Sequence, residues 1–271
     1  METAYHEALK NYLDKLVEKF ETPDFILLDP ISIPHGYDTP QDQEIIGLFA
    51  SLLAWGQRKT VLYKLAELSE RMNYRPHAFV QNFDINRDGH KLAGFKHRTF
   101  NSDDAICLTS NLSLVLNKYQ SIENAFSHFL KPENADVGPA IQGFSDTLFS
   151  IGEGTPKRLR KHLARPETGS ACKRFCMYLR WMVRSGPVDL GIWDKIPLEK
   201  LVLPLDVHSG RQARALGMLS RKQDDWRAAI ELTDQCRALC PEDPSKYDYA
   251  FFGAGAYGEE LDPKFLKTPV N

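Results

Sequence analysis

An aspartate that directly precedes a basic helix is the first feature of the sequence that suggests chemistry. Asp206 lies in the stretch Leu203-Pro-Leu-Asp-Val-His-Ser-Gly-Arg-Gln-Ala-Arg-Ala-Leu-Gly217, and Arg211 and Arg214 follow it with no acid between them. Asp suits the residue that caps a helix start and Gly the position after its end, which predicts a helix of about ten residues. The helix dipole favours an ionised carboxylate there. Asp206 is therefore either a simple cap or a carboxylate held ready for chemistry.

A strongly basic segment lies upstream of this aspartate. Residues 157–184 contain nine lysines and arginines against one acid, Glu167, a local charge of +8 in a chain of net charge −2. Residues 170–184 show the apolar spacing of an amphipathic helix, on which Lys173, Arg180 and Arg184 share a second stripe. That stripe suits a phosphate backbone, although an ordinary solvated face is the alternative.

The elements that must position these residues are helices. Apolar residues recur at helical spacing almost throughout, and strict alternation over the length of a strand is hard to find. Glycines and prolines divide the chain into about a dozen short helices, with the longest irregular stretches at about 22–38 and 185–205. The sequence therefore predicts an all-α fold.

Composition restricts the class of protein further. With 42% hydrophobic and 26% charged residues, 271 residues can bury a sizeable core. No apolar run approaches a membrane span and the N-terminus lacks a signal-peptide pattern, so we expect a cytoplasmic protein with no membrane partner. The five cysteines predict free thiols, although the pairs Cys172/Cys176 and Cys236/Cys240 leave a zinc site as an alternative. We expect no metal and no cofactor.

Three segments together resemble the helix-hairpin-helix DNA glycosylases of base-excision repair. Leu203 to Gly217 resembles their Val-Asp-Thr/Val-His segment, in which the Asp is the catalytic carboxylate. Gly169-Ser-Ala-Cys-Lys-Arg-Phe175 is similar to a degenerate hairpin Gly-x-Gly-x-Lys, and Leu52-Leu-Ala-Trp-Gly-Gln57 to their Leu-Leu-Ser-x-Gln turn. Pro166-Glu-Thr-Gly169 departs from the usual Leu-Pro-Gly-Val-Gly, and the iron–sulfur cysteine pattern of other members is absent.

The spacing of the key residues is closest to one branch of that superfamily. Lys173 and Asp206 are 33 residues apart, a spacing wider than in most of the family and closer to that of the archaeal 8-oxoguanine glycosylases, which the chain resembles in that respect. Pro244-Ser-Lys-Tyr-Asp-Tyr-Ala-Phe-Phe252 is similar to their helix that carries a base-contacting Asp and an aromatic four residues later. The whole chain looks most like an uncharacterised bacterial family.

The resemblance implies a two-lobed helix-hairpin-helix fold with a DNA groove between the lobes. The chain, 1–271, would form one unit, with a first lobe at roughly 40–150, the hairpin and catalytic Asp at 151–220, and 1–39 and 221–271 completing the second lobe. We expect a monomer whose partner is duplex DNA with a damaged base.

The resemblance also assigns roles to residues. Lys173 would be the nucleophile that forms a Schiff base and Asp206 the stabilising carboxylate, on an oxidised purine such as 8-oxoguanine. The lysine must be neutral to attack, and Arg174, Arg180 and burial are expected to lower its pKa. The expected DNA contacts are Gln57, which would enter the duplex, and Arg58, Lys59, Arg174, Arg180, Arg184, His208, Arg211 and Arg214. The expected base pocket draws on Trp55, Trp181, Trp193, Asp248 and Phe252.

Two other hypotheses fit the same residues. A module of the same fold that has lost catalysis would recognise damaged or distorted DNA through its phosphates. A helical protein that binds another protein or RNA would show no affinity for DNA at low salt. Purely structural interpretations also remain open: Trp181 as a core residue, Gln57 as a turn residue, and Lys173 as a solvated lysine.

Overall fold

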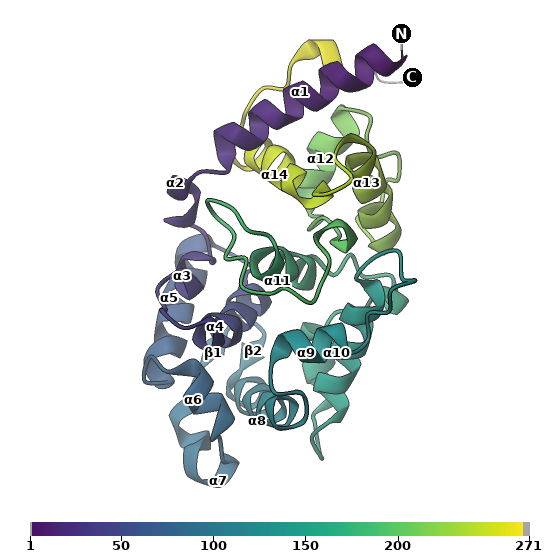
Figure 1. The fold of residues 1–271 in the computed structure, drawn as a ribbon. Helices are drawn as coiled ribbons and strands as arrows, with labels where there is room; N and C mark the ends of the chain where they lie inside the picture. Colours follow the sequence, from purple (N-terminus) through teal and green to yellow (C-terminus); the bar gives the residue numbers. More distant parts are fainter. Residues whose placement is uncertain (1, 268–271) are drawn as a thin grey trace.

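The computed structural model describes residues 2–267, and helices dominate it (Figure 1). The α-helices are α1 (Glu2–Phe20), α2 (Pro23–Ile26), α3 (Ser32–His35), α4 (Pro40–Leu53), α5 (Arg58–Arg71), α6 (Pro76–Gln81), α7 (Ile85–Asp88), α8 (Ser102–Tyr119), α9 (Ile122–Ser127), α10 (Gly138–Ser150), α11 (Lys173–Val183), α12 (Val207–Ala215), α13 (Trp226–Leu239) and α14 (Tyr247–Tyr257). Short 3₁₀ helices are η1 (Gly89–Leu92), η2 (Lys157–His162), η3 (Pro166–Thr168), η4 (Leu198–Lys200), η5 (Pro244–Lys246) and η6 (Pro263–Phe265). The prediction of an all-α protein is confirmed.

The one sheet in the described residues is a two-stranded antiparallel hairpin. Its strands are β1 (Lys96–His97) and β2 (Phe100–Asn101), with His97 opposite Phe100. No helix within residues 2–267 has both the length and the apolar character needed to span a bilayer.

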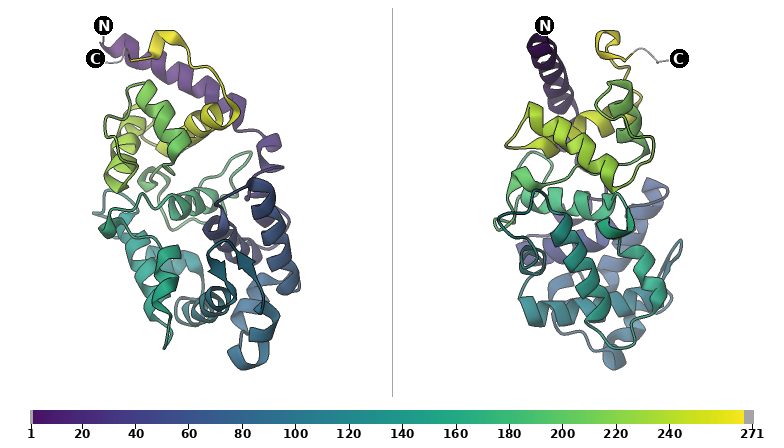
Figure 2. Two further views of the ribbon diagram at one scale, coloured as in Figure 1. Left: turned by 180° about the vertical axis from the view of Figure 1, so that it is seen from behind. Right: turned by 90° about the vertical axis from the view of Figure 1, so that its right-hand side faces the viewer.

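Helix α11 lies in the middle of the molecule, between two groups of helices (Figure 1). On one side α1 and α12 pack against α14, and on the other side α11 packs against α4, with α6 to α10 beyond it. Figure 2 shows the same order from behind and from the side, with the purple α1 and the yellow-green α14 at one end. Side chains on nearly every side of α11 are buried, including Phe175, Tyr178, Leu179 and Trp181. This central helix therefore connects the two groups.

A short turn joins α4 to α5. Thr39 caps α4, its hydroxyl oxygen accepting a hydrogen bond from the Asp42 N–H, and the helix ends at Leu53. Gly56 has φ +104°, a conformation that a residue with a Cβ rarely adopts, and it reverses the chain. Arg58 and Lys59 consequently belong to the first turn of α5 instead of a loop.

Two arginines near the end of α11 are buried in a network of carboxylates. Arg180 donates hydrogen bonds to Asp189 (3.2 Å) and to Asp248. Arg184 contacts Glu21, donates to Asp243 (2.7 Å) and also reaches Asp189 (3.2 Å). The predicted open stripe of Lys173, Arg180 and Arg184 is therefore wrong, because the guanidinium groups of the last two face carboxylates from other segments in the interior.

Asp189 is the link between the two arginines, so its substitution tests the network. We expect Asp189→Asn to lower the free energy of unfolding by about 3 kcal/mol, because it leaves two buried guanidinium groups short of negative charge. Urea denaturation of the variant beside Asp194→Asn, an exposed aspartate a few residues away, measures the effect. Equal stability of the two variants would contradict the structural role of the network.

Candidate functional site

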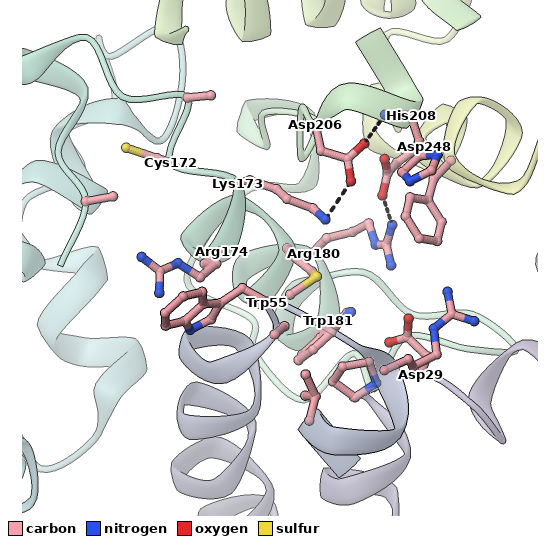
Figure 3. A pocket seen from close by; sticks show the side chains of 18 of the residues that line it. Asp29, Trp55, Cys172, Lys173, Arg174, Arg180, Trp181, Asp206, His208 and Asp248 are labelled. Carbon is pink, nitrogen blue, oxygen red and sulfur yellow. Dashed lines mark hydrogen bonds and ion pairs between the residues drawn. The ribbon is translucent and has the colours of Figure 1, made fainter. Parts of the chain in front are cut away.

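Lys173 and Asp206 meet although 33 residues separate them. Lys173 is the first residue of α11, and its Nζ lies 2.7 Å from Oδ2 of Asp206, the residue before α12 (Figure 3). Their side chains are 31% and 18% exposed, so the pair is accessible from solvent without being at the open surface. Nζ also lies 5.5 Å from the centroid of the Phe252 ring. The arrangement places an amine and a carboxylate in contact at the mouth of a cavity.

Asp206 acts as a helix cap and as an ion-pair partner at the same time. Its Oδ1 accepts hydrogen bonds from the N–H groups of His208 (2.9 Å) and Ser209 (3.0 Å), while Oδ2 accepts from Lys173. Burial by itself would raise the pKa of this carboxyl group, but the Lys173 ammonium and the helix N–H groups outweigh burial and lower the pKa below its usual value. Asp206 is thus ionised at neutral pH, as a carboxylate that stabilises positive charge must be.

The cavity beside this pair has a volume of about 630 Å³. Side chains from both helix groups line it, which is why no continuous stretch of sequence defines it. Among them are Phe25, Trp55, Trp181, Tyr249 and Phe252, whose rings give the cavity a largely aromatic wall. The size lies within the range of small-molecule sites.

Most of the residues expected in a pocket or near it do line the cavity. The expected pocket residues found there are Trp55, Trp181, Asp248 and Phe252, together with the expected contact residues Arg58, Arg174, Arg180 and His208. His208 approaches the Gly255 carbonyl oxygen through Nδ1 (3.3 Å), and its ring packs edge-on to Phe252. The sequence therefore identified much of the wall, although it could not place these residues relative to one another.

Several expected site residues lie elsewhere. Trp193 is buried between Phe126 and Tyr178 and does not line the cavity, so its assignment to the pocket is wrong. Arg184 is buried in the carboxylate network and has no open face. Arg214 pairs with Asp224 (2.6 Å).

Three further expected contact residues are exposed but outside the cavity wall. Gln57 is the exposed residue before α5, and its predicted entry into a duplex stays a prediction. Lys59 and Arg211 are exposed and form no ion pair within the described residues. Both therefore keep their charge available to a partner.

The structure neutralises most of the basic segment 157–184. Six of its nine cations contact carboxylates, in most cases from other parts of the chain: Arg158, Arg160, Arg165, Lys173, Arg180 and Arg184. Lys157, Lys161 and Arg174 have no ion-pair partner in residues 2–267. The charge of +8 counted from the sequence overstates the net positive charge that this segment presents in the folded protein, because acids distant in sequence pack against it.

The expected hairpin is reduced to a turn. The segment before α11 contains only the 3₁₀ turns η2 and η3. Gly169 (φ +79°) and Cys172 (φ +51°) then turn the backbone into the helix that begins at Lys173. Lys173 consequently gains its position from a turn and a helix start rather than from a pair of packed helices.

Asp29 is a cavity residue that the sequence did not reveal. Its side chain is buried between α2 and α3, Oδ1 accepts a hydrogen bond from the Ile31 N–H (3.1 Å), and burial raises its pKa. Asp29 precedes Pro30, an ordinary turn dipeptide, so no local signal marks it. Burial likewise raises the pKa of Asp248, to about 6, against the opposing effect of Arg180. The cavity therefore holds three carboxyl groups besides Asp206, and the third, Asp224, is paired with Arg214.

The five cysteines are free thiols, as predicted. In the described part of the chain, no group of three His, Cys, Asp or Glu side chains is arranged to hold a metal ion.

A comparison with known families adds one finding. Residues 29–257 match the family described as protein of unknown function (DUF2400). The chain belongs to the DUF2400 family. No curated protein and no solved structure matches it. The matched range in this DUF2400 protein includes every cavity residue named above except Phe25.

The cap role of Asp206 can be separated from its charge. Asparagine caps helices as well as aspartate does, whereas alanine does not, so Asp206→Ala is expected to be about 1 kcal/mol less stable than Asp206→Asn. Urea denaturation of both variants measures the difference. A destabilisation that is the same for Asn and Ala would assign the stabilising effect to charge alone.

The raised pKa of Asp248 predicts a specific pH dependence. An unfolded aspartate ionises near pH 4 and folded Asp248 near pH 6, so the folded protein loses stability from this group as pH rises through that interval. The stability of the wild type minus that of Asp248→Asn should fall by up to about 3 kcal/mol between pH 4 and pH 6.5. Parallel curves for the two proteins over this interval would contradict the assignment.

Proposed function

We propose that this protein is a DNA glycosylase with AP-lyase activity, of the helix-hairpin-helix kind, that forms a Schiff base through Lys173. The observation that carries the proposal is the 2.7 Å contact between Lys173 Nζ and Asp206 Oδ2 beside a cavity large enough for a purine. An aspartate that only caps a helix needs no lysine beside it, and a lysine that only faces solvent needs no capping carboxylate beside it. Their juxtaposition across 33 residues at a cavity mouth fits a reaction centre.

The chemistry requires a neutral amine and a nearby anion. Asp206 is the carboxylate in hydrogen-bonding contact with Nζ, so it is placed to accept the ammonium proton. The Nζ lone pair then bonds to the anomeric carbon, the glycosidic C–N bond breaks with its electron pair on the base nitrogen, and the base takes up the proton that Asp206 had accepted. Asp206 is then ionised again and stabilises the positive charge that Nζ and the sugar now share.

The Schiff base forms in the following step. The Nζ nitrogen loses its second proton, the bond from the anomeric carbon to the ring oxygen breaks, and the oxygen takes up that proton as the C=N bond forms. Abstraction of a proton from the adjacent carbon then expels the 3′ phosphate, which is the lyase step.

The cavity suits a base turned out of the duplex. Such enzymes hold the base by stacking and by hydrogen bonds to its edge. Trp55 and Phe252 offer ring faces or edges, while Asp248 and Asp29 offer carboxyl groups that accept N–H donors or, when protonated, donate. An oxidised purine such as 8-oxoguanine, rich in edge donors, is the proposed substrate class.

A DNA groove between the two helix groups completes the proposal. Arg58, Lys59 and Arg211 form no ion pair among the described residues, and they flank the segments that carry Trp55 and Asp206. Phosphates of a duplex laid across the cavity mouth would meet these charges.

Borohydride trapping tests the nucleophile. The protein is incubated with duplex DNA that carries an abasic site or 8-oxoguanine, and then reduced. We expect a covalent complex that is lost in Lys173→Ala and retained in Lys222→Ala, an exposed lysine without an ion pair. Trapping by Lys173→Ala as strong as by the wild type would refute the role of Lys173.

The carboxylate has its own test. Asp206→Asn keeps the cap but removes the charge, so we expect base excision to slow by about 100-fold or more with unchanged folding. Single-turnover rates and far-UV circular dichroism measure the two effects. An Asp206→Asn protein as active as the wild type would contradict the proposed mechanism.

A non-catalytic DNA-binding module is the second candidate. The reduction of the expected hairpin to a turn favours it, since the backbone that precedes the lysine has diverged from the glycosylase pattern. This alternative predicts salt-dependent binding to damaged duplex DNA that survives Lys173→Gln, with no covalent complex and no strand cleavage.

A further inference from the structure

A second hollow lies behind Trp55, separate from the Lys173–Asp206 pair. Its volume is about 340 Å³, and its wall is formed by Trp55, Thr99, Lys161, His162 and Arg174. Trp55 and Arg174 also line the first cavity, so the two spaces share a wall. No carboxylate lines the second hollow.

Arg174 is the most informative residue of this wall. It follows Lys173 directly, but its guanidinium group points away from Asp206 and toward Trp55 (Figure 3). Its one hydrogen bond within the described residues goes from Nη1 to the Leu52 carbonyl oxygen (2.7 Å). Burial lowers its pKa, and no carboxylate offsets that burial. Arg180 on the same helix and Arg184 directly after it, by contrast, each contact at least two carboxylates.

The surrounding charges are positive and unbalanced. Lys161 on η2 is exposed without an ion pair, and so is Arg98, whose guanidinium carbon lies 5.0 Å from the centroid of the Trp55 ring. Asp104, whose Oδ2 lies 3.7 Å from His162 Nε2, is fully buried and paired with Arg158 (3.1 Å). Burial lowers the pKa of His162 to about 4, so His162 adds no charge at neutral pH. Two of the three unpaired cations of segment 157–184, Lys161 and Arg174, thus face one small space.

From these charges we infer that the second hollow binds a phosphate group, held between Arg174 and Lys161. A guanidinium group with unused N–H donors, an ammonium group and a threonine hydroxyl are the partners that phosphate oxygens take in proteins. Desolvating an arginine without a carboxylate is costly, and a bound anion removes that cost.

The position of the hollow suggests which phosphate. Lys173 and Arg174 are consecutive and diverge around Trp55, so a nucleotide could place its sugar at Lys173 and a neighbouring phosphate at Arg174. This identification of the ligand as a strand phosphate rests on the proposed function, whereas the anion site rests on the charges alone. The site would fix the register of the strand relative to the reactive amine.

Two exposed lysines on η2 provide a matched pair of variants. Lys161 lines the hollow, while Lys157, at the start of the same turn, does not, and neither forms an ion pair in residues 2–267. Lys161→Gln and Lys157→Gln therefore change the net charge equally. Lys161 is preferable to Arg174, because Arg174→Gln also removes the hydrogen bond to Leu52 and can disturb folding.

The first measurement uses inorganic phosphate as the probe. We expect sodium phosphate to raise the melting temperature of the wild type above its value in sodium chloride of the same ionic strength. Lys161→Gln should lose at least half of this increase and Lys157→Gln should keep it. Equal responses of the two variants, or no phosphate response in the wild type, would overturn the site.

The second measurement uses duplex DNA with a tetrahydrofuran abasic analogue, which cannot form a Schiff base. We expect Lys161→Gln to weaken binding by about fivefold to tenfold and to lower the slope of log K against log salt by about 1, as the loss of one phosphate contact does. Lys157→Gln should leave both values close to those of the wild type. Equal losses of DNA affinity in Lys161→Gln and Lys157→Gln would exclude a strand phosphate in the hollow.

The two measurements distinguish the site from the function. A phosphate response that depends on Lys161, in a protein that neither binds the duplex nor traps an abasic site, would keep the anion site and reject the glycosylase. Trapping of an abasic site with equal behaviour of the two lysine variants would keep the glycosylase and reject the hollow as a phosphate site.

Discussion

The burial of Arg180 and Arg184 among four carboxylates is the interaction on which the rest of the structure depends. Glu21, Asp189, Asp243 and Asp248 come from the residue after α1, the loop after α11, the segment before η5, and α14. Each guanidinium group has several N–H donors in a fixed plane, so one arginine can fix two carboxylates in place. The network therefore holds α11 against the helix group of α1 and α14, while the apolar side of α11 packs against α4.

That fixed central helix determines what its first turn can present. Lys173 and Arg174 begin α11, and successive helical residues point about 100° apart. One therefore faces Asp206 and the other faces Trp55 (Figure 3). Segment 157–184 does not form an open cationic surface, because most of its positive charges pair with carboxylates of the same protein. The unmatched charges are concentrated near Trp55, where Arg98, Lys161 and Arg174 gather, and this concentration makes the surface beside the cavity selective for anions.

Membership of the DUF2400 family and the geometry of the cavity bear on different questions. The family match covers residues 29–257 and states no activity. The proposed glycosylase chemistry stands instead on the amine–carboxylate contact, on the lowered pKa of Asp206 and on a cavity with an aromatic wall. Helix α1 lies outside the matched range, yet Glu21, the residue that follows it, contacts Arg184, which makes α1 a part of the same folded body.

The sequence by itself determined the helical class, the cap at Asp206 and the glycine that ends α12, because each depends on near neighbours through periodicity and capping. It also singled out Asp206 by its place before a basic helix, whereas the role of Lys173 as a nucleophile came only through a resemblance. Tertiary structure decided the rest. Whether Arg180 is a surface cation or a buried anchor depends on Asp189 and Asp248. Asp29 reaches the cavity only because α2 and α3 fold over it. The second hollow exists because Trp55, Lys161 and Arg174 converge from three segments. Charge pairing and cavities are properties of distant residues brought together, and local sequence patterns do not encode them.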